Sequence, residues 1–121
     1  EDNLVYHTIV NTIEDITRIR QSKYIQSEIG QVYAEIRDLL RSGKKVLFCG
    51  APCQVAGLYS VVGEEQGLYT VDFICRGVNS PKAYLAWLKE LEHKQKSAVT
   101  RVWFKYKKYG WKLSPRRHLQ H

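Results

Sequence analysis

Two cysteines occupy positions in which a thiolate would be able to do redox or metal chemistry. Cys53 lies in the loop 50–54, and Cys75 opens the loop 75–80; each loop follows an apolar run and leads into a predicted helix. The positive end of a helix dipole favours the thiolate form, which is the nucleophile and the metal ligand. The alternative, that both are small packing side chains, carries equal weight on the residues alone.

The third cysteine and the histidines carry weaker signals. Cys49 lies inside an apolar run beside Phe48, and we interpret it as a structural residue. It forms no zinc motif with Cys53, because the sequence has no second pair of ligands at a suitable spacing. Neither a Gly-x-Gly-x-x-Gly fingerprint nor a Gly-Lys-Ser phosphate loop is present, so no motif indicates a nucleotide site. Helix N-termini bind phosphates without these motifs, so the sequence is still compatible with a bound nucleotide. The histidines are scattered, and we interpret them as exposed or packing residues: His7, His93, His118 and His121.

The elements that must position these loops form a crossover. Two continuous apolar runs, 46–49 and 68–74, predict strands buried on both faces of a parallel sheet. A helix from about 54 to 62 joins them as a βαβ unit. Because neighbouring parallel strands end at the same edge of a sheet, we expect Cys53 and Cys75 to lie at that edge.

Further elements complete an α/β pattern. Apolar spacing predicts amphipathic helices over 32–40, ending at Gly43, and from Pro81 to about Lys94. The predicted fold class is α/β, a mostly parallel central sheet flanked by helices, with room for an antiparallel edge strand near residue 102 in the alternating stretch 99–106. Nearer the start we expect a strand over 4–10, a helix capped by Asn11 with Glu14, and a polar loop over 21–30.

Length and composition set the class of protein. The chain has 121 residues, 44% of them hydrophobic and 26% charged, which suits one soluble domain over 4–112 and excludes intrinsic disorder. No apolar run approaches the roughly 18 residues that a membrane-spanning helix needs. Three cysteines without a secretion signal indicate reduced thiols and a cytoplasmic location. We expect 113–121 to be a disordered basic tail.

The positive charge is confined to the end of the chain. Residues 94–121 hold 9 Lys and Arg and no acidic residue, whereas residues 1–93 hold 10 basic and 12 acidic ones. One interpretation is a nucleic-acid-binding module, in which bases stack on aromatic rings and lysines meet phosphates. A solvated basic face is the favoured interpretation, and nucleic acid is not the expected partner. The residues concerned are Lys105, Tyr106, Lys107, Lys108, Tyr109, Trp111 and Lys112.

Six short motifs, in order, resemble the beta-subunit family of coenzyme F420 hydrogenases and dehydrogenases. The resemblance extends from about Val5 to Trp111 and implies part of an oxidoreductase subunit that binds flavin and iron–sulfur. Such a subunit passes electrons between a [4Fe–4S] cluster, FAD and a soluble acceptor, and its partners are other oxidoreductase subunits or a soluble electron carrier. The motifs are Ser22–Ser27, Gly43–Phe48, Pro52–Leu58, Val71–Val78, Ser80–Lys82 and Phe104–Trp111.

The resemblance also implies roles for individual residues. Cys53 and Cys75 match cysteines that serve the cluster or its surroundings. The place of Arg76, directly after Cys75, rather than the resemblance, leads us to expect that its cation stabilises a reduced, anionic flavin. No catalytic residue is assigned. The residues implied to contact FAD are Ser22, Lys23, Tyr24, Gln26, Ser27, Gly50, Pro52, Gln54 and Arg76.

This sequence departs from the family pattern at three points. Gln21 stands where the family usually has Gly, and Arg76 stands where it usually has His. Relatives also continue into a later cysteine-rich segment, and a [4Fe–4S] cluster needs four thiolates where this chain has three. We therefore expect the fragment alone to be inactive and to hold FAD and the cluster incompletely or not at all. A cofactor-free scaffold that binds a partner is the remaining alternative.

Overall fold

The computed structural model describes residues 4–102 and 104, which fall into two compact units. The α/β unit comprises Tyr6–Ile9 and Ser27–Val78. The helical unit comprises the other described residues. A single domain over 4–112 stays a prediction, and the expected tail at 113–121 lies outside the described residues.

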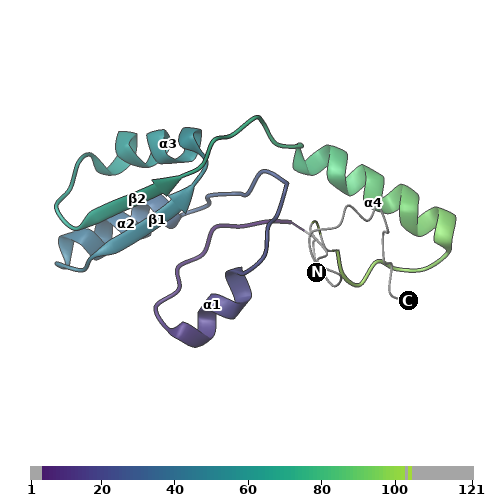
Figure 1. The fold of residues 1–121 in the computed structure, drawn as a ribbon, viewed down its shortest axis with the longest axis horizontal. Coiled ribbons are helices and arrows are strands. Elements are labelled where there is room, and N and C mark those ends of the chain that lie inside the picture. Colours follow the sequence, from purple (N-terminus) through teal and green to yellow (C-terminus); the bar gives the residue numbers. More distant parts are fainter. Residues whose placement is uncertain (1–3, 103, 105–121) are drawn as a thin grey trace. The chain divides into compact units, whose positions relative to one another are not determined.

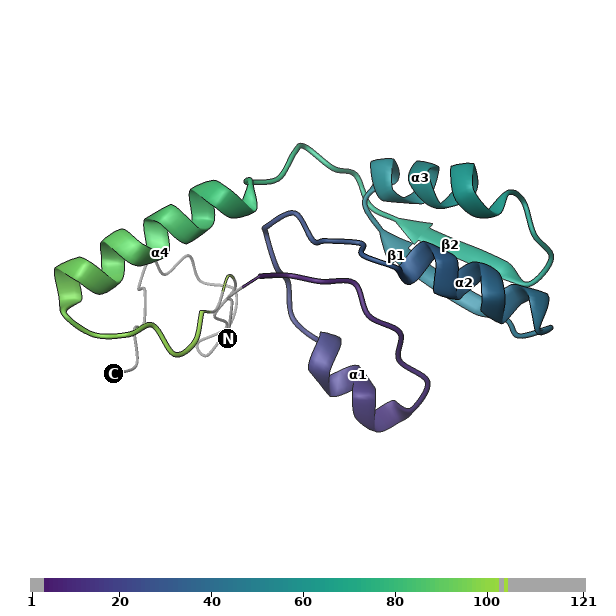
Figure 2. The same cartoon turned by 180° about the vertical axis from the view of Figure 1, so that it is seen from behind.

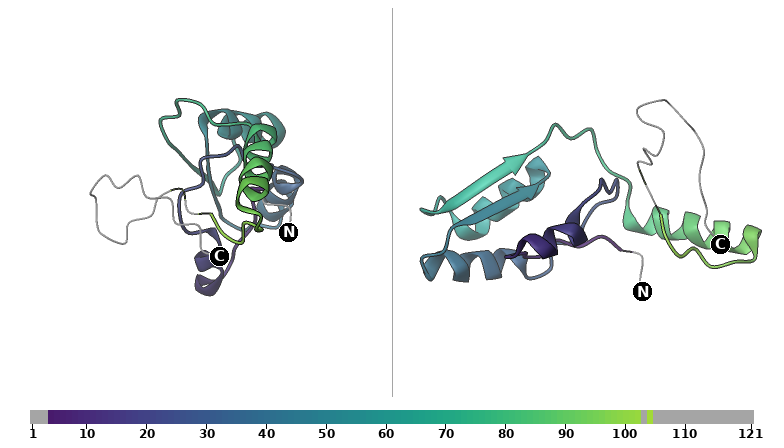
Figure 3. Two further views of the ribbon diagram at one scale, coloured as in Figure 1. Left: turned by 90° about the vertical axis from the view of Figure 1, so that its right-hand side faces the viewer. Right: turned by 60° about the horizontal axis from the view of Figure 1, so that its bottom comes forward.

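The α/β unit is built around a parallel pair of strands. In it, β1 (Val46–Gly50) and β2 (Leu68–Asp72) lie side by side and α3 (Pro52–Val62) connects them, as Figures 1 and 3 show. The amphipathic helix α2 (Val32–Arg41) precedes β1. The predicted βαβ crossover and the α/β fold class are thereby confirmed, with boundaries close to those that the apolar runs indicate.

Both helices of this unit cover the same face of the strands. Val46 and Phe48 of β1 and Leu68 of β2 pack against apolar side chains of α2 and α3. Figure 2 shows α2 in front of the strands with α3 beside it. Val32, Ile36 and Leu40, the apolar residues that predict α2 from the sequence, are the residues of α2 that are buried. They lie four positions apart and therefore share one face of the helix. The buried core consists of Val32, Ile36, Leu40, Phe48, Leu58 and Val62.

The other face of the strands is open, so the prediction of strands buried on both faces is wrong. Leu47 is 67% exposed, and Cys49, Tyr69 and Val71 on the same face are also exposed. Alternate residues of a strand point to opposite faces, and within the α/β unit the helices lie on one of them only. Cys49 is therefore not the packed residue that its apolar neighbours suggest.

The helical unit contains α1 (Ile13–Ile19) and α4 (Pro81–Gln95). Ser80 caps α4 as predicted, its hydroxyl accepting a hydrogen bond from the Ala83 N–H at 3.1 Å. Leu88 is the buried residue of α4, and the Tyr84 ring lies 5.9 Å from the ring of Phe104. Among the described residues, no helix has the length and apolar character needed to cross a membrane.

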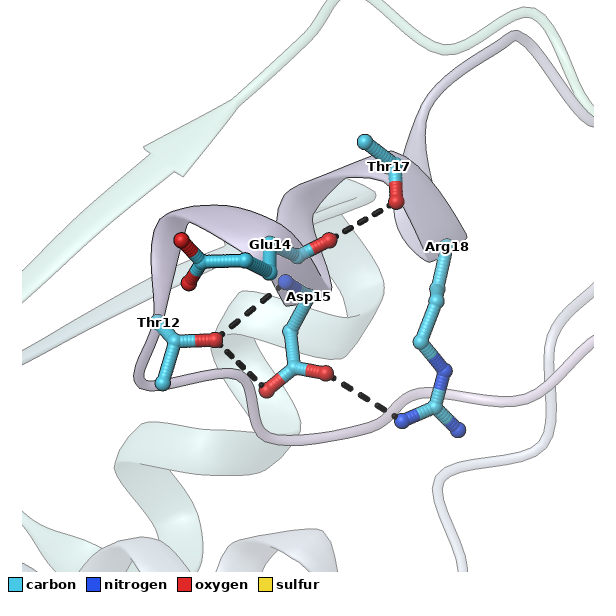
Figure 4. A network of polar contacts seen from close by, with 5 residues as sticks. All are labelled: Thr12, Glu14, Asp15, Thr17 and Arg18. Atoms are coloured by element: carbon cyan, nitrogen blue, oxygen red, sulfur yellow. Dashed lines mark hydrogen bonds and ion pairs between the residues drawn. The ribbon is translucent and has the colours of Figure 1, made fainter.

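Helix α1 begins one residue later than the sequence suggests. Thr12, and not Asn11, is the N-cap: its hydroxyl accepts from the Asp15 N–H at 3.3 Å and donates to the Asp15 carboxylate at 3.0 Å (Figure 4). Arg18 lies 3.4 Å from the other oxygen of that carboxylate. The cap position shifts because Thr12 also satisfies the spacing of three residues to an acidic side chain, here Asp15.

Two predicted strands are not formed by the described residues. Within 4–10 the structure has only an isolated parallel bridge between Tyr6 and Glu28, and the neighbouring residues do not continue the pairing. Residues 99–102 and 104 lie outside any strand, and 103, 105 and 106 of the expected edge strand are outside the described residues. The predicted loop over 21–30 is confirmed, apart from isolated bridges at Ile25 and Glu28.

Gln21 occupies a backbone conformation that favours glycine. Its φ is +80°, directly after the C-cap residue Arg20 of α1, where the left-handed region is common and glycine is preferred. We expect Gln21→Gly to raise the free energy of unfolding of the helical unit by about 0.5–1 kcal/mol, because relief of the strained φ exceeds the entropy that glycine loses. Urea unfolding measures this change.

The neighbouring substitution Arg20→Gly is the matched control, because the φ of Arg20 is −60° and carries no such strain. It is expected to lower the free energy of unfolding. A destabilising Gln21→Gly would contradict the strain that we assign to this turn.

Candidate functional site

The paired ends of β1 and β2 bring two segments together. Gly50, the last residue of β1, pairs with Asp72, the last residue of β2. Cys53 follows Gly50 by three residues and Cys75 follows Asp72 by three, so both cysteines leave the same edge of the sheet, as predicted. Both are exposed. The prediction that Cys53 lies in a loop over 50–54 is wrong, because α3 already begins at Pro52 and Cys53 lies in its first turn. We call this edge, with Ala51, the first turn of α3 and the loop 73–78, the carboxyl edge.

The loop after β2 exposes a thiol and a cation. Every residue of 71–80 is exposed, including Cys75 and Arg76. The Cys75 sulfur accepts a hydrogen bond from the Gly77 N–H at 3.3 Å, and Gly77 has a φ of +102° that a glycine adopts without strain. The N–H···S contact turns the chain locally around the sulfur and leaves the Arg76 guanidinium accessible.

The junction between β1 and α3 is held by Gln54. Its side-chain oxygen accepts from the Ala51 N–H at 2.9 Å, and its amide nitrogen donates to the Ser27 hydroxyl at 3.0 Å and to the Ser27 carbonyl at 3.4 Å. Pro52 opens α3 at a position where the missing N–H costs no hydrogen bond. The Gln54 amide thus joins the start of α3 to the segment at Ser27.

Tyr33 of α2 supports the same turn of α3. Its hydroxyl donates to the Gln54 carbonyl at 2.6 Å. Burial raises the pKa of Tyr33, and the electrostatic influence of the nearby Cys53 raises it further. The phenol therefore stays protonated and keeps its role as a donor.

Gly50 is required by the side chains of the protein itself. A Cβ at this position would lie 2.8 Å from a ring carbon of Phe48 and 3.2 Å from the Gln54 side-chain oxygen. Phe48 is buried, so its ring has little room to move. The packing of Phe48 and Gln54 accounts for the glycine without a ligand.

Sequence reasoning missed His7 as a member of this cluster. Its Nδ1 lies 2.9 Å from the Ser27 hydroxyl, its Nε2 lies 3.3 Å from the Cys49 carbonyl, and its ring stacks on Phe48 at 5.3 Å. Burial lowers the pKa of His7, while the hydrogen bond to Cys49 opposes this to a smaller extent. The hydrogen-bond partners lie 20 and 42 positions away, and no local pattern signals such contacts.

The polar motif 22–27 is divided between the two units. Ser27 belongs to the α/β unit, whereas Ser22, Lys23, Tyr24 and Gln26 belong to the helical unit. Each of these four is exposed. The motif therefore does not act as one continuous surface within either unit.

Local contacts explain three of these residues in the helical unit. The Lys23 ammonium donates to three carbonyls at the end of α1 at 3.1–3.3 Å, where the helix dipole favours a cation. The Tyr24 ring meets Phe104 edge-on at 6.0 Å. The Gln26 backbone N–H donates to the Asn79 carbonyl at 3.3 Å.

The described residues do not form a metal centre by themselves. Within 4–102 and 104, no three or more His, Cys, Asp or Glu side chains are grouped so that they could hold a metal ion. A [4Fe–4S] cluster takes four thiolates, and the whole chain has three cysteines. Cys53 and Cys75 alone therefore do not fit the cluster. The basic, aromatic residues 105–112 lie outside the described residues.

One comparison with known proteins gives a match. Residues 43–118, more than half of the chain, match the family defined by the C terminus of the beta subunit of coenzyme F420 hydrogenase/dehydrogenase. The matched range includes β1, α3, β2 and α4, and with them both segments of the carboxyl edge. No curated protein and no solved structure matches the chain.

Proposed function

Because the chain belongs to this family of coenzyme F420 hydrogenase/dehydrogenase beta subunits, we propose that it serves an oxidoreductase by helping to bind flavin at the carboxyl edge. One observation carries this proposal. The family match spans both segments that follow the paired residues Gly50 and Asp72, the first turn of α3 and the loop 73–78. In open parallel sheets, ligands bind outside the carboxyl ends of the strands.

The side chains at the carboxyl edge suit an anionic cofactor. Arg76 presents an exposed guanidinium, the side chain that best matches a phosphate oxygen pair. The 11-residue helix α3 directs its positive end at the same edge. When bound, FAD exchanges a hydride for single electrons, while the protein supplies orientation and electrostatics.

The residues that contact FAD in this proposal differ in what else they do. Arg76 and Pro52 are exposed at the carboxyl edge, while Gly50 is a packing requirement. Ser27 and Gln54 form hydrogen bonds with each other. We infer that they shape the start of α3 and have few hydrogen-bonding groups left for the cofactor. Roles for Ser22, Lys23, Tyr24 and Gln26 remain predictions from the resemblance.

This chain alone does not fit a [4Fe–4S] cluster, which takes four thiolates where the chain has three cysteines. We propose Cys53 and Cys75 as ligands only in a protein that supplies the other thiolates, and we assign no electron-transfer step to them. Other oxidoreductase subunits or a soluble electron carrier are the proposed partners, and the cytoplasm is the proposed compartment.

Arg76 provides the sharpest test within the chain. In the natural gene product that contains this chain, Arg76→Gln is expected to weaken FAD binding about tenfold or more, because a charge-assisted hydrogen bond to phosphate is lost. Titration of the deflavinated protein with FAD, followed by flavin fluorescence, measures the dissociation constant.

The matched control is Arg41→Gln. Arg41 is exposed and is the last residue of α2. The chain then enters β1 at its amino end, which is the end opposite to the carboxyl edge. Arg41→Gln should leave FAD affinity unchanged. If Arg76→Gln and Arg41→Gln bind FAD with equal affinity, Arg76 does not contact the cofactor. A protein that binds no FAD at all would favour the cofactor-free scaffold.

A further inference from the structure

The open face of β1 and β2 carries a continuous apolar surface. In the register of the two strands, Leu47 lies opposite Tyr69 and Cys49 lies opposite Val71. Cys49 is exposed, and each of the other three side chains is at least half exposed. Because neighbouring strands lie about 4.8 Å apart, the four uncharged side chains form one surface. In Figure 1 the strands lie in front of α2, so this face is turned toward the viewer.

The apolar surface continues past the strands into the loop 73–78. Phe73 is half exposed, and Ile74 is 97% exposed, so its side chain buries almost nothing against the protein. Single exposed apolar residues are ordinary, but a contiguous set of them marks a site of interaction. We call this set the apolar patch; it consists of Leu47, Cys49, Tyr69, Val71, Phe73 and Ile74.

Charged side chains flank the apolar patch at both ends. Lys45 directly precedes β1 and Glu65 lies shortly before β2, while Asp72 and Arg76 lie at the carboxyl edge; all four are exposed. An apolar centre with a polar rim is the usual arrangement of a protein–protein interface. Both signs of charge occur at each end, so the rim suits a protein surface of mixed charge rather than a polyanion.

The dimensions of the open face favour a helix as its occupant. Two strands of five residues extend about 16 Å lengthwise and about 10 Å across. A helix is about 10 Å wide and covers 16 Å in about three turns. Parallel sheets are covered by helices on both faces, and in the α/β unit α2 and α3 cover only one.

A second copy of the chain fits the open face less well than a helix. A stable interface buries about 800 Å² on each partner, and two strands of five residues offer much less to a second pair of such strands. Sheets that pack face to face also belong to antiparallel sandwiches, whereas β1 and β2 are parallel.

We propose that the apolar patch is the docking surface for one amphipathic helix of another oxidoreductase subunit. The choice of partner rests on the proposed function, because the matched family is described as a beta subunit. The docked helix has about three turns, with an apolar stripe at positions i, i+3 or i+4, and i+7. Its stripe covers the paired side chains Leu47 and Tyr69, while Ile74 provides a further contact beyond the strand ends.

Cys49 reports on the coverage of the apolar patch without any variant. The natural gene product is compared alone and in complex with the oxidoreductase subunit that co-purifies with it. Alkylation by N-ethylmaleimide, followed by mass spectrometry of the Cys49 peptide, is expected to slow at least about tenfold in the complex. Equal rates would overturn the proposal, as would a Cys49 that is already protected in the uncomplexed protein, or a gene product that binds no other subunit.

Leu47→Asp separates docking from flavin binding. The variant is expected to weaken binding of the partner subunit about tenfold or more, because its carboxylate is buried against an apolar stripe. FAD affinity should not change, since Leu47 lies near the amino end of β1, away from the carboxyl edge. The docking proposal and the flavin proposal therefore fail in different measurements.

The matched control is Val61→Asp. Val61 is an exposed apolar residue of α3 and lies outside the apolar patch, so its replacement should leave the affinity for the partner subunit unchanged. If Leu47→Asp and Val61→Asp bind the partner equally well, the patch is not the docking surface.

Photo-crosslinking identifies the occupant. The apolar photoreactive residue p-benzoylphenylalanine replaces Leu47, and the complex is irradiated and analysed by mass spectrometry. Cross-links are expected in one segment of the partner subunit, at positions three or four residues apart, because such positions share a helix face. Cross-links at positions two apart, as in a strand, or to a second copy of this chain would contradict the proposal.

Discussion

Replacing Phe48 by alanine is expected to lower the free energy of unfolding of the α/β unit by about 3–5 kcal/mol. Phe48 is buried and contacts both the Tyr33 ring at 6.0 Å and the His7 ring at 5.3 Å. Its loss leaves a cavity between β1 and the helices and removes the surface on which His7 stacks. Urea unfolding followed by circular dichroism measures the change.

Leu47→Ala is the control for Phe48→Ala, because Leu47 is the preceding residue of the same strand and lies on the open face. It is expected to change the free energy of unfolding by no more than about 0.5 kcal/mol, as is usual for exposed positions. Similar losses for the two variants would show that both faces of β1 are covered, which contradicts the open face described above.

Replacing Leu58 by alanine is expected to cost about 2–5 kcal/mol, because this side chain is 0% exposed at the centre of the core between α2, α3 and β1. The effect should be strongest on the connection between β1 and β2, which α3 provides. Hydrogen exchange of the β1 and β2 amides, expressed as free energies of opening, measures it.

Val61→Ala provides the comparison on the same helix. Val61 is 48% exposed, so its truncation removes less buried surface and should cost well under half of the Leu58→Ala effect. If the two truncations destabilise the strands equally, α3 does not present the face to the core that we describe.

The parts of the fold that were predictable are those with local causes. The runs at 46–49 and 68–74 are rich in apolar residues, and the spacing of Val32, Ile36 and Leu40 marks a helix face without reference to distant residues. The parallel pairing of β1 and β2 also followed, because a helix between two strands leads to a crossover. The placement of Cys53 and Cys75 at one edge is a direct consequence of that pairing.

What escaped prediction depends on which surfaces are covered. Leu47, Tyr69 and Val71 have the same apolar character as buried strand residues, and a sequence does not state how many helices a sheet will carry. The exposure of Cys49 follows from the same cause.

The candidate site was only partly predictable. The cysteines and Arg76 could be placed from their positions after strands, whereas His7 enters through contacts with Phe48, Cys49 and Ser27 that span 20 to 42 positions of the chain. Residue type alone also did not show that Ser27 and Gln54 bind each other. A polar side chain in a motif looks the same in a sequence whether it contacts a cofactor or the protein.

The measurement that tests the central proposal most directly is the visible spectrum of the natural gene product containing this chain, purified without oxygen, together with its flavin content by chromatography. The proposal predicts flavin absorption bands and close to one FAD per polypeptide, reduced in proportion when Arg76→Gln weakens binding. A colourless protein that releases no flavin on denaturation, and takes up none when FAD is added, would contradict it.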